Sequence, residues 1–309
     1  MQNAAASGHD RRQQIIDFMS GFTLETTPRS AAKVPDFRAH VRAGATIFIT
    51  FLQGSEFKDT IQVARRLKAE GFNPVPHISA RGIPDRRFLE ESLAMLTGEI
   101  GIREVLCIAG ADAVPVGEYG DTMQLLESGL FDKYGISRIG LAGHPEGIPT
   151  IPDGAIWRAL EWKNAFAART DAALYLVTQF CFEAPPVIAW DRKLQVQGNR
   201  LPIYIGVPGL ATIRTLLDHA KACGIGPSMR FVARQAMNVA RLMTVSAPDK
   251  LIAELAAYKA SDPRCGISGV HMYPLGGMKK TSDWAYAVVD GKFTMSARNG
   301  GFDVEAPPG

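Results

Sequence analysis

Several apolar segments of this chain end in polar residues that are able to transfer protons or bind a polar ligand. Glu25 closes the short apolar run FTLET, and His77 lies within NPVPHIS. Gln179 follows Thr178 in LYLVTQFCF, whose β-branched and aromatic content is typical of a strand buried on both faces. Such side chains at the ends of buried strands predict a site for chemistry on a small polar molecule.

Glu25 and Gln179 each have a chemical role and a structural alternative. Partial desolvation at the end of an apolar strand raises the pKa of a carboxyl group, as a general acid near neutral pH requires. Alternatively, Glu25 is a solvated strand-end carboxylate that caps a neighbouring helix. Gln179 offers a donor and an acceptor, which match the amide edge of a heterocycle. Its alternative is a glutamine buried in a structural hydrogen-bond network.

Three histidines, His77, His144 and His271, lie near the ends of predicted strands. Three imidazoles that converge on one point resemble a catalytic zinc site. Their spacing carries no local metal motif, which favours histidines that hydrogen-bond a polar ligand or neighbouring loops. We therefore expect no metal, with the three-histidine site as an alternative.

The segment ADAVPVGEYG predicts a long loop with Asp112 at its start and glycines at 117 and 120. Glycines allow the backbone to approach a bulky ligand closely. The chain contains neither the Walker spacing nor a GxSxG elbow. Phosphoryl transfer by a P-loop and hydrolysis by a serine nucleophile therefore lack their motifs.

The sequence predicts eight short strands, each followed by a helical segment, and these elements must position the polar residues. Strict alternation of strand and helix predicts a parallel sheet with right-handed crossovers, and eight units predict an α/β fold of the (β/α)8 TIM barrel type. An open doubly wound sheet is the alternative, although no GxGxxG follows an early strand. The strands are predicted at 22–26, 46–51, 73–79, 104–110, 138–143, 174–182, 202–207 and 267–273.

The predicted barrel is a single domain that spans residues 21–295. Residues 1–20 form an N-terminal extension with a short amphipathic helix. Residues 296–309 form a C-terminal tail, whose turn-forming composition predicts a loose terminus.

Composition excludes several classes of protein. The 309 residues are 46% hydrophobic and 21% charged, as in an ordinary globular protein. The net charge of +3, without basic clusters among aromatics, argues against nucleic-acid binding. The N-terminus lacks an apolar signal region, and no apolar run could span a bilayer, so we expect a cytoplasmic protein without a membrane partner. The cysteines, which show no CxxC spacing, are interpreted as reduced packing residues: Cys107, Cys181, Cys223 and Cys265.

Taken in order, the strand-end motifs resemble those of the methylenetetrahydrofolate reductase family, as a divergent bacterial-type member with a single catalytic barrel. The motifs are LET-TP, PHIS, GAD, PEG, TQFCF and HMY, and they follow the family's order from about residue 20 to residue 290. TQF-x-F is the most specific. The resemblance implies an FAD-containing barrel that reduces 5,10-methylenetetrahydrofolate to 5-methyltetrahydrofolate in one-carbon metabolism. NADH or NADPH and the folate would take turns over one flavin face, in a homo-oligomer.

The resemblance also implies roles for individual residues. Glu25 corresponds to the acid that protonates the folate and opens its five-membered ring, and Asp112 to the aspartate near pterin and flavin. Gln179 corresponds to the glutamine that holds the pterin edge. Further substrate contacts are implied for Phe180, Phe182 and Tyr273. Cofactor contacts are implied for Thr50, His77, Asp112, Tyr119, Gly120, His144, Glu146 and Lys163, the last as a phosphate partner.

The sequence departs from the family pattern near three of these residues. LETTPR replaces the aromatic-rich FEFFPP, so the surroundings of Glu25 are more polar. Ala111 stands where an arginine commonly precedes the aspartate, and His144 replaces a tyrosine. Two other functions stay open: a flavin-free, metal-assisted lyase or aldolase, and a non-catalytic folate-binding subunit of a methyl-transfer system.

Overall fold

The computed structural model describes residues 2–51, 56–148, 151–222, 242–297 and 300–305. Eight parallel strands close into a barrel in the order β1-β2-β3-β4-β5-β6-β7-β10. The predicted (β/α)8 barrel is thereby confirmed, and the open sheet is wrong. Cys223 lies outside the described residues. The barrel strands are β1 (Thr23–Thr26), β2 (Thr46–Ile49), β3 (Asn73–Ser79), β4 (Glu104–Ile108), β5 (Arg138–Gly143), β6 (Ala173–Phe180), β7 (Ile203–Pro208) and β10 (Ile267–Tyr273).

Helices follow the strands, and several begin at a capping side chain. The carboxylates of Asp85 and Asp121 accept hydrogen bonds from the backbone N–H groups of Phe88 (2.7 Å) and Gln124 (2.9 Å), which satisfies free donors at two helix starts. The helices are α1 (Gln2–Met19), α2 (Pro28–Ala31), α3 (Phe57–Ala69), α4 (Arg86–Ala94), α5 (Thr122–Glu127), α6 (Leu130–Lys133), α7 (Asp153–Phe166), α8 (Ala184–Val196), α9 (Ile213–Ala222), α11 (Asp249–Ser261) and α12 (Met278–Val289).

The chain forms two compact units. The first unit consists of Thr23–Gly143 and Gly154–Val177. The second unit consists of Met1–Phe22, His144–Asp153 and Thr178–Gly309. Among the described residues, no helix is long and apolar enough to cross a membrane.

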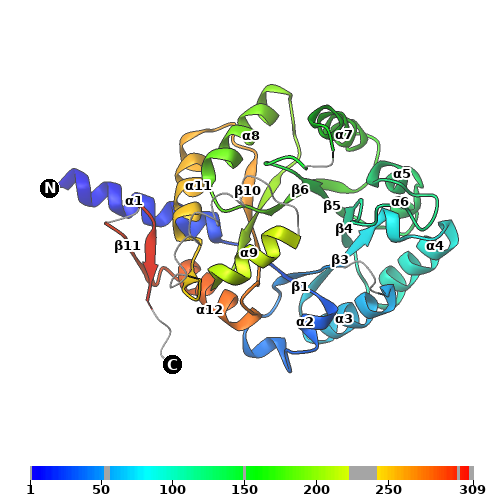
Figure 1. Cartoon of the computed structure of the whole chain (residues 1–309), viewed down its shortest axis with the longest axis horizontal. Coiled ribbons are helices and arrows are strands. Elements are labelled where there is room, and N and C mark those ends of the chain that lie inside the picture. Colours follow the sequence, from blue (N-terminus) through cyan, green and yellow to red (C-terminus); the bar gives the residue numbers. More distant parts are fainter. Residues whose placement is uncertain (1, 52–55, 149–150, 223–241, 298–299, 306–309) are drawn as a thin grey trace. The chain divides into compact units, whose positions relative to one another are not determined.

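In the first unit, α3 packs against β2 and β3 (Figure 1). Ile61, Ala64 and Leu67 recur every three residues along α3 and are all buried. This spacing puts them on one face of the helix. Ile47 and Ile49 of β2 are fully buried, as expected for a strand of a parallel barrel.

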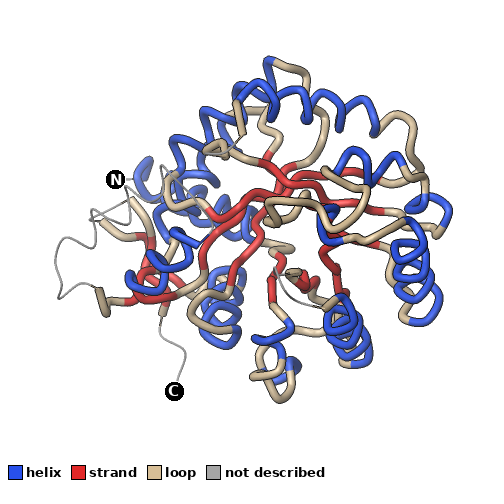
Figure 2. Tube along the Cα trace, turned by 45° about the vertical axis from the view of Figure 1, so that its right-hand side comes forward, coloured by secondary structure: helices blue, strands red, loops and turns tan. Residues whose placement is uncertain are grey.

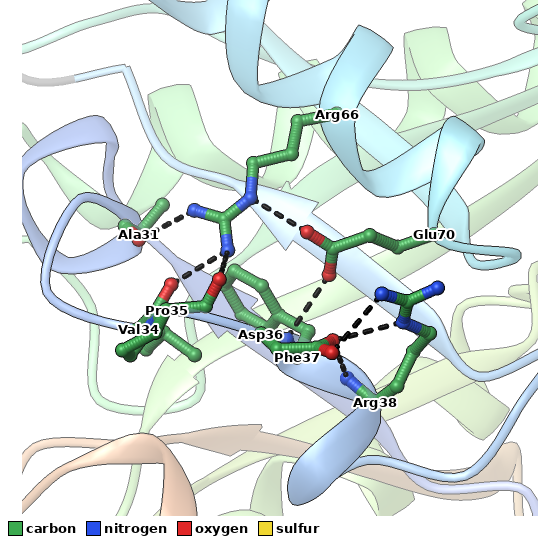
Figure 3. Close-up of polar contacts among 8 residues, drawn as sticks. All are labelled: Ala31, Val34, Pro35, Asp36, Phe37, Arg38, Arg66 and Glu70. Atoms are coloured by element: carbon green, nitrogen blue, oxygen red, sulfur yellow. Dashed lines mark hydrogen bonds and ion pairs between the residues drawn. The ribbon is translucent and has the colours of Figure 1, made fainter.

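The irregular segment between α2 and β2 is held to α3 by Arg66 (Figure 3). Its guanidinium donates to the carbonyl oxygens of Ala31 (2.9 Å) and Val34 (2.6 Å). Its Nε donates to Glu70 Oε1 at 2.7 Å, and Glu70 Oε2 accepts from the Phe37 N–H at 3.0 Å. Side-chain groups therefore satisfy backbone groups that no regular element pairs.

In the second unit, α1 packs against α11, α12 and β10. Ile15 and Phe18 of α1 are buried. Arg12 donates to the carbonyls of Gly291 and Phe293, and its guanidinium carbon lies 4.8 Å from the centroid of the Phe293 ring. The N-terminal helix is thus tied to residues near the other end of the chain.

Part of the C-terminal tail is ordered. β12 (Phe302–Val304) pairs antiparallel with β11 (Phe293–Met295), and Figure 2 draws the pair in red. Phe302 is 2% exposed and stacks on Trp284 with 5.7 Å between ring centroids. The predicted loose terminus is wrong for 302–304, because burial of the Phe302 ring outweighs the turn-forming composition around it.

We expect Phe302→Ala to destabilise the protein by about 3 kcal/mol, because the variant leaves a cavity beside Trp284 and loses the apolar burial of the ring. Urea denaturation followed by circular dichroism measures this change. Thr294→Ala, at an exposed position of β11, serves as the matched control. Loss of less than about 1 kcal/mol would show that the hairpin is not held by Phe302.

Candidate functional site

In the first unit, Glu25 and His77 meet near the carboxyl ends of β1 and β3. Glu25 Oε2 lies 3.5 Å from His77 Nε2, and the side chains are only 11% and 5% exposed. Strand β2 lies between β1 and β3, and the Phe48 ring of β2 packs edge-on against His77 at 6.1 Å. The interpretation of Glu25 as a solvated strand end is therefore wrong. The two side chains form a buried ion pair when His77 is protonated.

Thr50 follows β2 at the same edge of the sheet. Its N–H donates to the Thr26 carbonyl at 2.8 Å, which extends the strand pairing by one residue. Its hydroxyl is buried, and among the described residues it has no hydrogen-bond partner. A buried hydroxyl without a partner costs about 1–3 kcal/mol, a cost that a polar ligand atom could remove.

Lys163 of α7 directs its ammonium group at β5. Its Nζ donates to the Ala142 carbonyl at 2.8 Å, and the residue is 8% exposed. Burial lowers the pKa of Lys163 from 10.5 to about 8, with no further cause. An anionic ligand at this ammonium would oppose that shift.

The loop after β4 carries Asp112 and Gly120. Their carbonyl oxygens accept hydrogen bonds from Arg81, at 3.0 Å and 2.9 Å respectively. The Gly120 N–H donates to the Gln124 side chain at 2.7 Å. Sequence reasoning missed Arg81, because no motif marks an arginine that bonds to backbone carbonyls of another loop.

Tyr119, in the same loop, is buried. Burial raises the pKa of its phenol, and the nearby Glu118 carboxylate adds to the rise. Tyr119 lines a cavity of about 340 Å³ together with Arg86, Glu118, Gln124, Glu127 and Ser128, which belong to the loop and to the ends of helices. A flavin contact of Tyr119 stays a prediction.

In the second unit, Gln179 lies at the carboxyl end of β6, which is bonded to two other strands. Thr178 Oγ1 accepts from the Gly206 N–H of β7 at 2.8 Å, and the Tyr273 hydroxyl of β10 donates to the Thr178 carbonyl at 3.0 Å. A Cβ on Gly206 would lie 2.4 Å from that carbonyl oxygen, so only glycine permits this approach. Tyr273 thus positions the residue before Gln179.

The Gln179 side chain has one local bond. Its Oε1 accepts from the Phe180 N–H at 3.1 Å, and its Nε2 donates to no other residue in the described part of the chain. The network connecting Thr178, Gly206 and Tyr273 does not include the Gln179 amide. Its amide nitrogen is therefore available to a ligand.

Three predicted aromatic residues form one cluster. The Phe180 ring is 2% exposed and lies 5.7 Å from Phe182 and 5.4 Å from Tyr273 between ring centroids. Phe180 thus supports the other two rings from within the core. Phe182 lines a cavity of about 160 Å³ beside the ends of β6 and β7, together with Glu183, Pro185, Pro208, Gly209, Leu216, Ser246, Ala247, Pro248, Lys250, Leu251 and Glu254.

The remaining predicted residues of the second unit follow β5 or lie in β10. His144 and Glu146 belong to a tight turn in which the Gly147 N–H donates to the His144 carbonyl at 3.1 Å. His271 is fully buried, with its ring 4.8 Å from that of Tyr273. Within the described ranges, no three His, Cys, Asp or Glu side chains are grouped to hold a metal ion.

No protein-family model matches the chain. An uncharacterised protein from Clostridium thermocellum that binds two copies of 5-methyl-5,6,7,8-tetrahydrofolic acid is similar with a TM-score of 0.54 and 13% identity, over 88% of this chain and 96% of that chain. A chitinase from Rhizomucor miehei matches with a TM-score of 0.44 and 11% identity, over 84% of this chain and 99% of that chain.

We expect the buried ammonium of Lys163 to make stability depend on pH. Its folded pKa of about 8 lies below the unfolded value of 10.5, so between these values the unfolded chain binds a proton that the folded chain lacks. Stability then rises with pH through this window. The full difference corresponds to roughly 3 kcal/mol.

Urea denaturation of the wild type and of Lys163→Met, from pH 7 to pH 10, measures this effect as the difference between the two proteins. The variant should be the more stable near pH 7, because it buries no charge, and its advantage should shrink as pH rises. Lys193→Met, at an exposed position of α8, is the control and should show a constant difference. A constant difference for Lys163→Met as well would contradict the prediction.

Proposed function

We propose that this chain binds a reduced folate at the carboxyl ends of its barrel strands and, with a bound flavin, reduces 5,10-methylenetetrahydrofolate to 5-methyltetrahydrofolate with NADH or NADPH. The observation that carries the proposal is the buried Glu25–His77 pair, at 3.5 Å, near the ends of β1 and β3. The order of the strand-end motifs supports it. So does the fold, which is shared with a protein that binds 5-methyltetrahydrofolate.

The Glu25–His77 pair fits the proton step of this reaction. Opening the five-membered ring requires a proton on one ring nitrogen, after which the bond from that nitrogen to the methylene carbon breaks and leaves an iminium cation. Glu25 would donate this proton. Loss of this proton leaves a Glu25 carboxylate, and His77, 3.5 Å away, would offset its negative charge when the imidazole takes up a proton. A hydride added to the iminium carbon completes the methyl group.

Asp112 in the first unit and Gln179 in the second each have a proposed substrate role. The carboxylate of Asp112, on a loop that Arg81 holds by its backbone, would stabilise the positive charge of the iminium as it develops. Gln179 Nε2 would donate to the pterin edge, with Phe182 as an apolar wall. Both roles follow the family resemblance.

Two features of the first unit fit a flavin dinucleotide. The buried Thr50 hydroxyl, which has no partner in the described ranges, could bond a ring heteroatom. The buried ammonium of Lys163, whose pKa is lowered to about 8, could pair with a phosphate. When bound, the flavin would carry the hydride from the nicotinamide to the folate. His77, Tyr119, Gly120, His144 and Glu146 are proposed as further contacts.

A folate-binding protein without reductase activity is the second candidate. The C. thermocellum protein binds 5-methyltetrahydrofolate, and Ala111 here replaces the arginine of the reductase pattern. A metal-assisted lyase is not carried forward, because the described residues contain no suitable group of ligands.

A visible absorption spectrum of the purified protein, with added FAD if it is colourless, separates the candidates. The reductase should bind flavin, lose its visible absorption with NADH or NADPH under anaerobic conditions, and recover it with methylenetetrahydrofolate. Binding of 5-methyltetrahydrofolate without flavin binding would favour the second candidate. Failure to bind either molecule would contradict both.

Glu25→Gln should separate the two half-reactions. We expect flavin reduction by the nicotinamide to change by less than about twofold, and the folate half-reaction to slow by about a hundredfold or more, because the amide has no proton to donate. Anaerobic stopped-flow absorbance measures both rates. Glu91→Gln, an exposed position on α4, is the control. Equal loss in both half-reactions would refute the proposed role of Glu25.

A further inference from the structure

In the loop between β4 and α5, residues 109–121, the two valines are exposed, whereas Tyr119 is buried. Val114 is 77% exposed and Val116 is 66% exposed. Burial of these side chains therefore does not hold the loop in place. Tyr119 is buried near one end of the loop, and polar contacts hold the part that carries Asp112.

Arg81, in the turn that follows β3, makes those contacts. Its N–H donates to the Ala109 carbonyl at 2.9 Å, and its carbonyl accepts from the Val116 N–H at 2.9 Å. Its side chain reaches further along the same loop, with Nε on the Gly120 carbonyl at 2.9 Å and Nη1 on the Asp112 carbonyl at 3.0 Å. One residue thus bonds the loop at four places.

Two glycines bring the loop into direct contact with the turn that contains Arg81. A Cβ on Gly117 would lie 1.9 Å from the Pro84 carbonyl oxygen. A Cβ on Gly110, whose φ is +97°, would lie 2.1 Å from Ser79 Oγ. At Gly117 the loop backbone therefore contacts the turn backbone directly, and at Gly110 it lies against the Ser79 side chain. The guanidinium bonds one carbonyl between these glycines, that of Asp112, and one beyond them, that of Gly120.

Only arginine suits this arrangement. A guanidinium is planar and presents donors in a fixed fork, so it can bond the carbonyls of Asp112 and Gly120 together, whereas a lysine ammonium lacks that fork. The bond to the Asp112 carbonyl also places a positive charge at the backbone of this residue.

We propose that Arg81 is the positioning residue of the Asp112 loop. Its action is through Asp112, whose backbone it holds. The ordering of the loop stands on the contacts above. The consequence for the folate half-reaction rests on the proposed function.

Hydrogen exchange measured by mass spectrometry tests the ordering without any ligand. In Arg81→Ala, peptides from 109–121 should exchange at least about tenfold faster, because the loop loses two charge-assisted bonds. Millimolar guanidinium should restore part of the protection, methylammonium should not, and Arg81→Lys should be intermediate.

The matched control is Arg103→Ala. Arg103 also donates to two carbonyls, those of Thr97 (2.9 Å) and Ile102 (2.8 Å), but before β4 begins. The Arg103→Ala variant should leave the hydrogen exchange of residues 109–121 unchanged. Unchanged exchange in Arg81→Ala, or equal acceleration in both variants, would overturn the ordering role.

The half-reactions test the link to Asp112. Arg81→Ala should slow the folate half-reaction about tenfold and leave flavin reduction by the nicotinamide within about twofold. In a protein that already carries Asp112→Asn, the added Arg81→Ala should slow the folate half-reaction little further. Equal loss in both half-reactions, or full additivity with Asp112→Asn, would overturn positioning through Asp112. If the protein proves to bind folate without flavin, the affinity for 5-methyltetrahydrofolate replaces the rate as the readout. The hydrogen-exchange result does not depend on the proposed function. A failure of the proposed function can therefore be distinguished from a failure of the proposed role of Arg81.

Discussion

Hydrogen bonding between parallel strands, closed into a ring, is the constraint on which the other features of this protein depend. Closure leaves no sheet edge unpaired. It also aligns neighbouring carboxyl ends, as the bond from the Thr50 N–H to the Thr26 carbonyl shows for β1 and β2. Apolar strand interiors such as Ile47 and Ile49 supply the burial that stabilises the ring. Polar side chains can then be carried at the ends, where they are partly desolvated without lying in the strand interior.

Several buried polar groups at or near these strand ends lower the stability of the folded protein. The Glu25–His77 pair is almost completely buried, the Thr50 hydroxyl has no partner in the described part of the chain, and Lys163 keeps an ammonium group in apolar surroundings. Each of these costs is one that a bound ligand could lower. Proteins accept such local violations of stability chiefly at functional sites. The three groups, all of the first unit, are therefore more informative about function than the better satisfied polar network around Thr178.

Arginine bonded to backbone carbonyls is a recurring device in this chain. Arg66 holds the segment before β2, Arg81 holds the loop after β4, and Arg12 joins α1 to Gly291 and to the first residue of β11. The bonded carbonyls lie at the ends of regular elements or in the irregular backbone between them. A guanidinium can bond several of them with one side chain. This device lets long connections around a barrel adopt one conformation without a core of their own.

The sequence by itself determined the fold and the types of residue at the strand ends. The predicted strands 73–79, 138–143 and 267–273 match the observed bounds, because local periodicity and β-branched content report on burial along a strand. Tertiary structure alone decided that Glu25 faces His77, that Lys163 is buried against Ala142, and that Arg81 bonds the Asp112 loop. These contacts join residues that are far apart along the chain. Their geometry depends on how strands and loops pack in space, which no local pattern encodes.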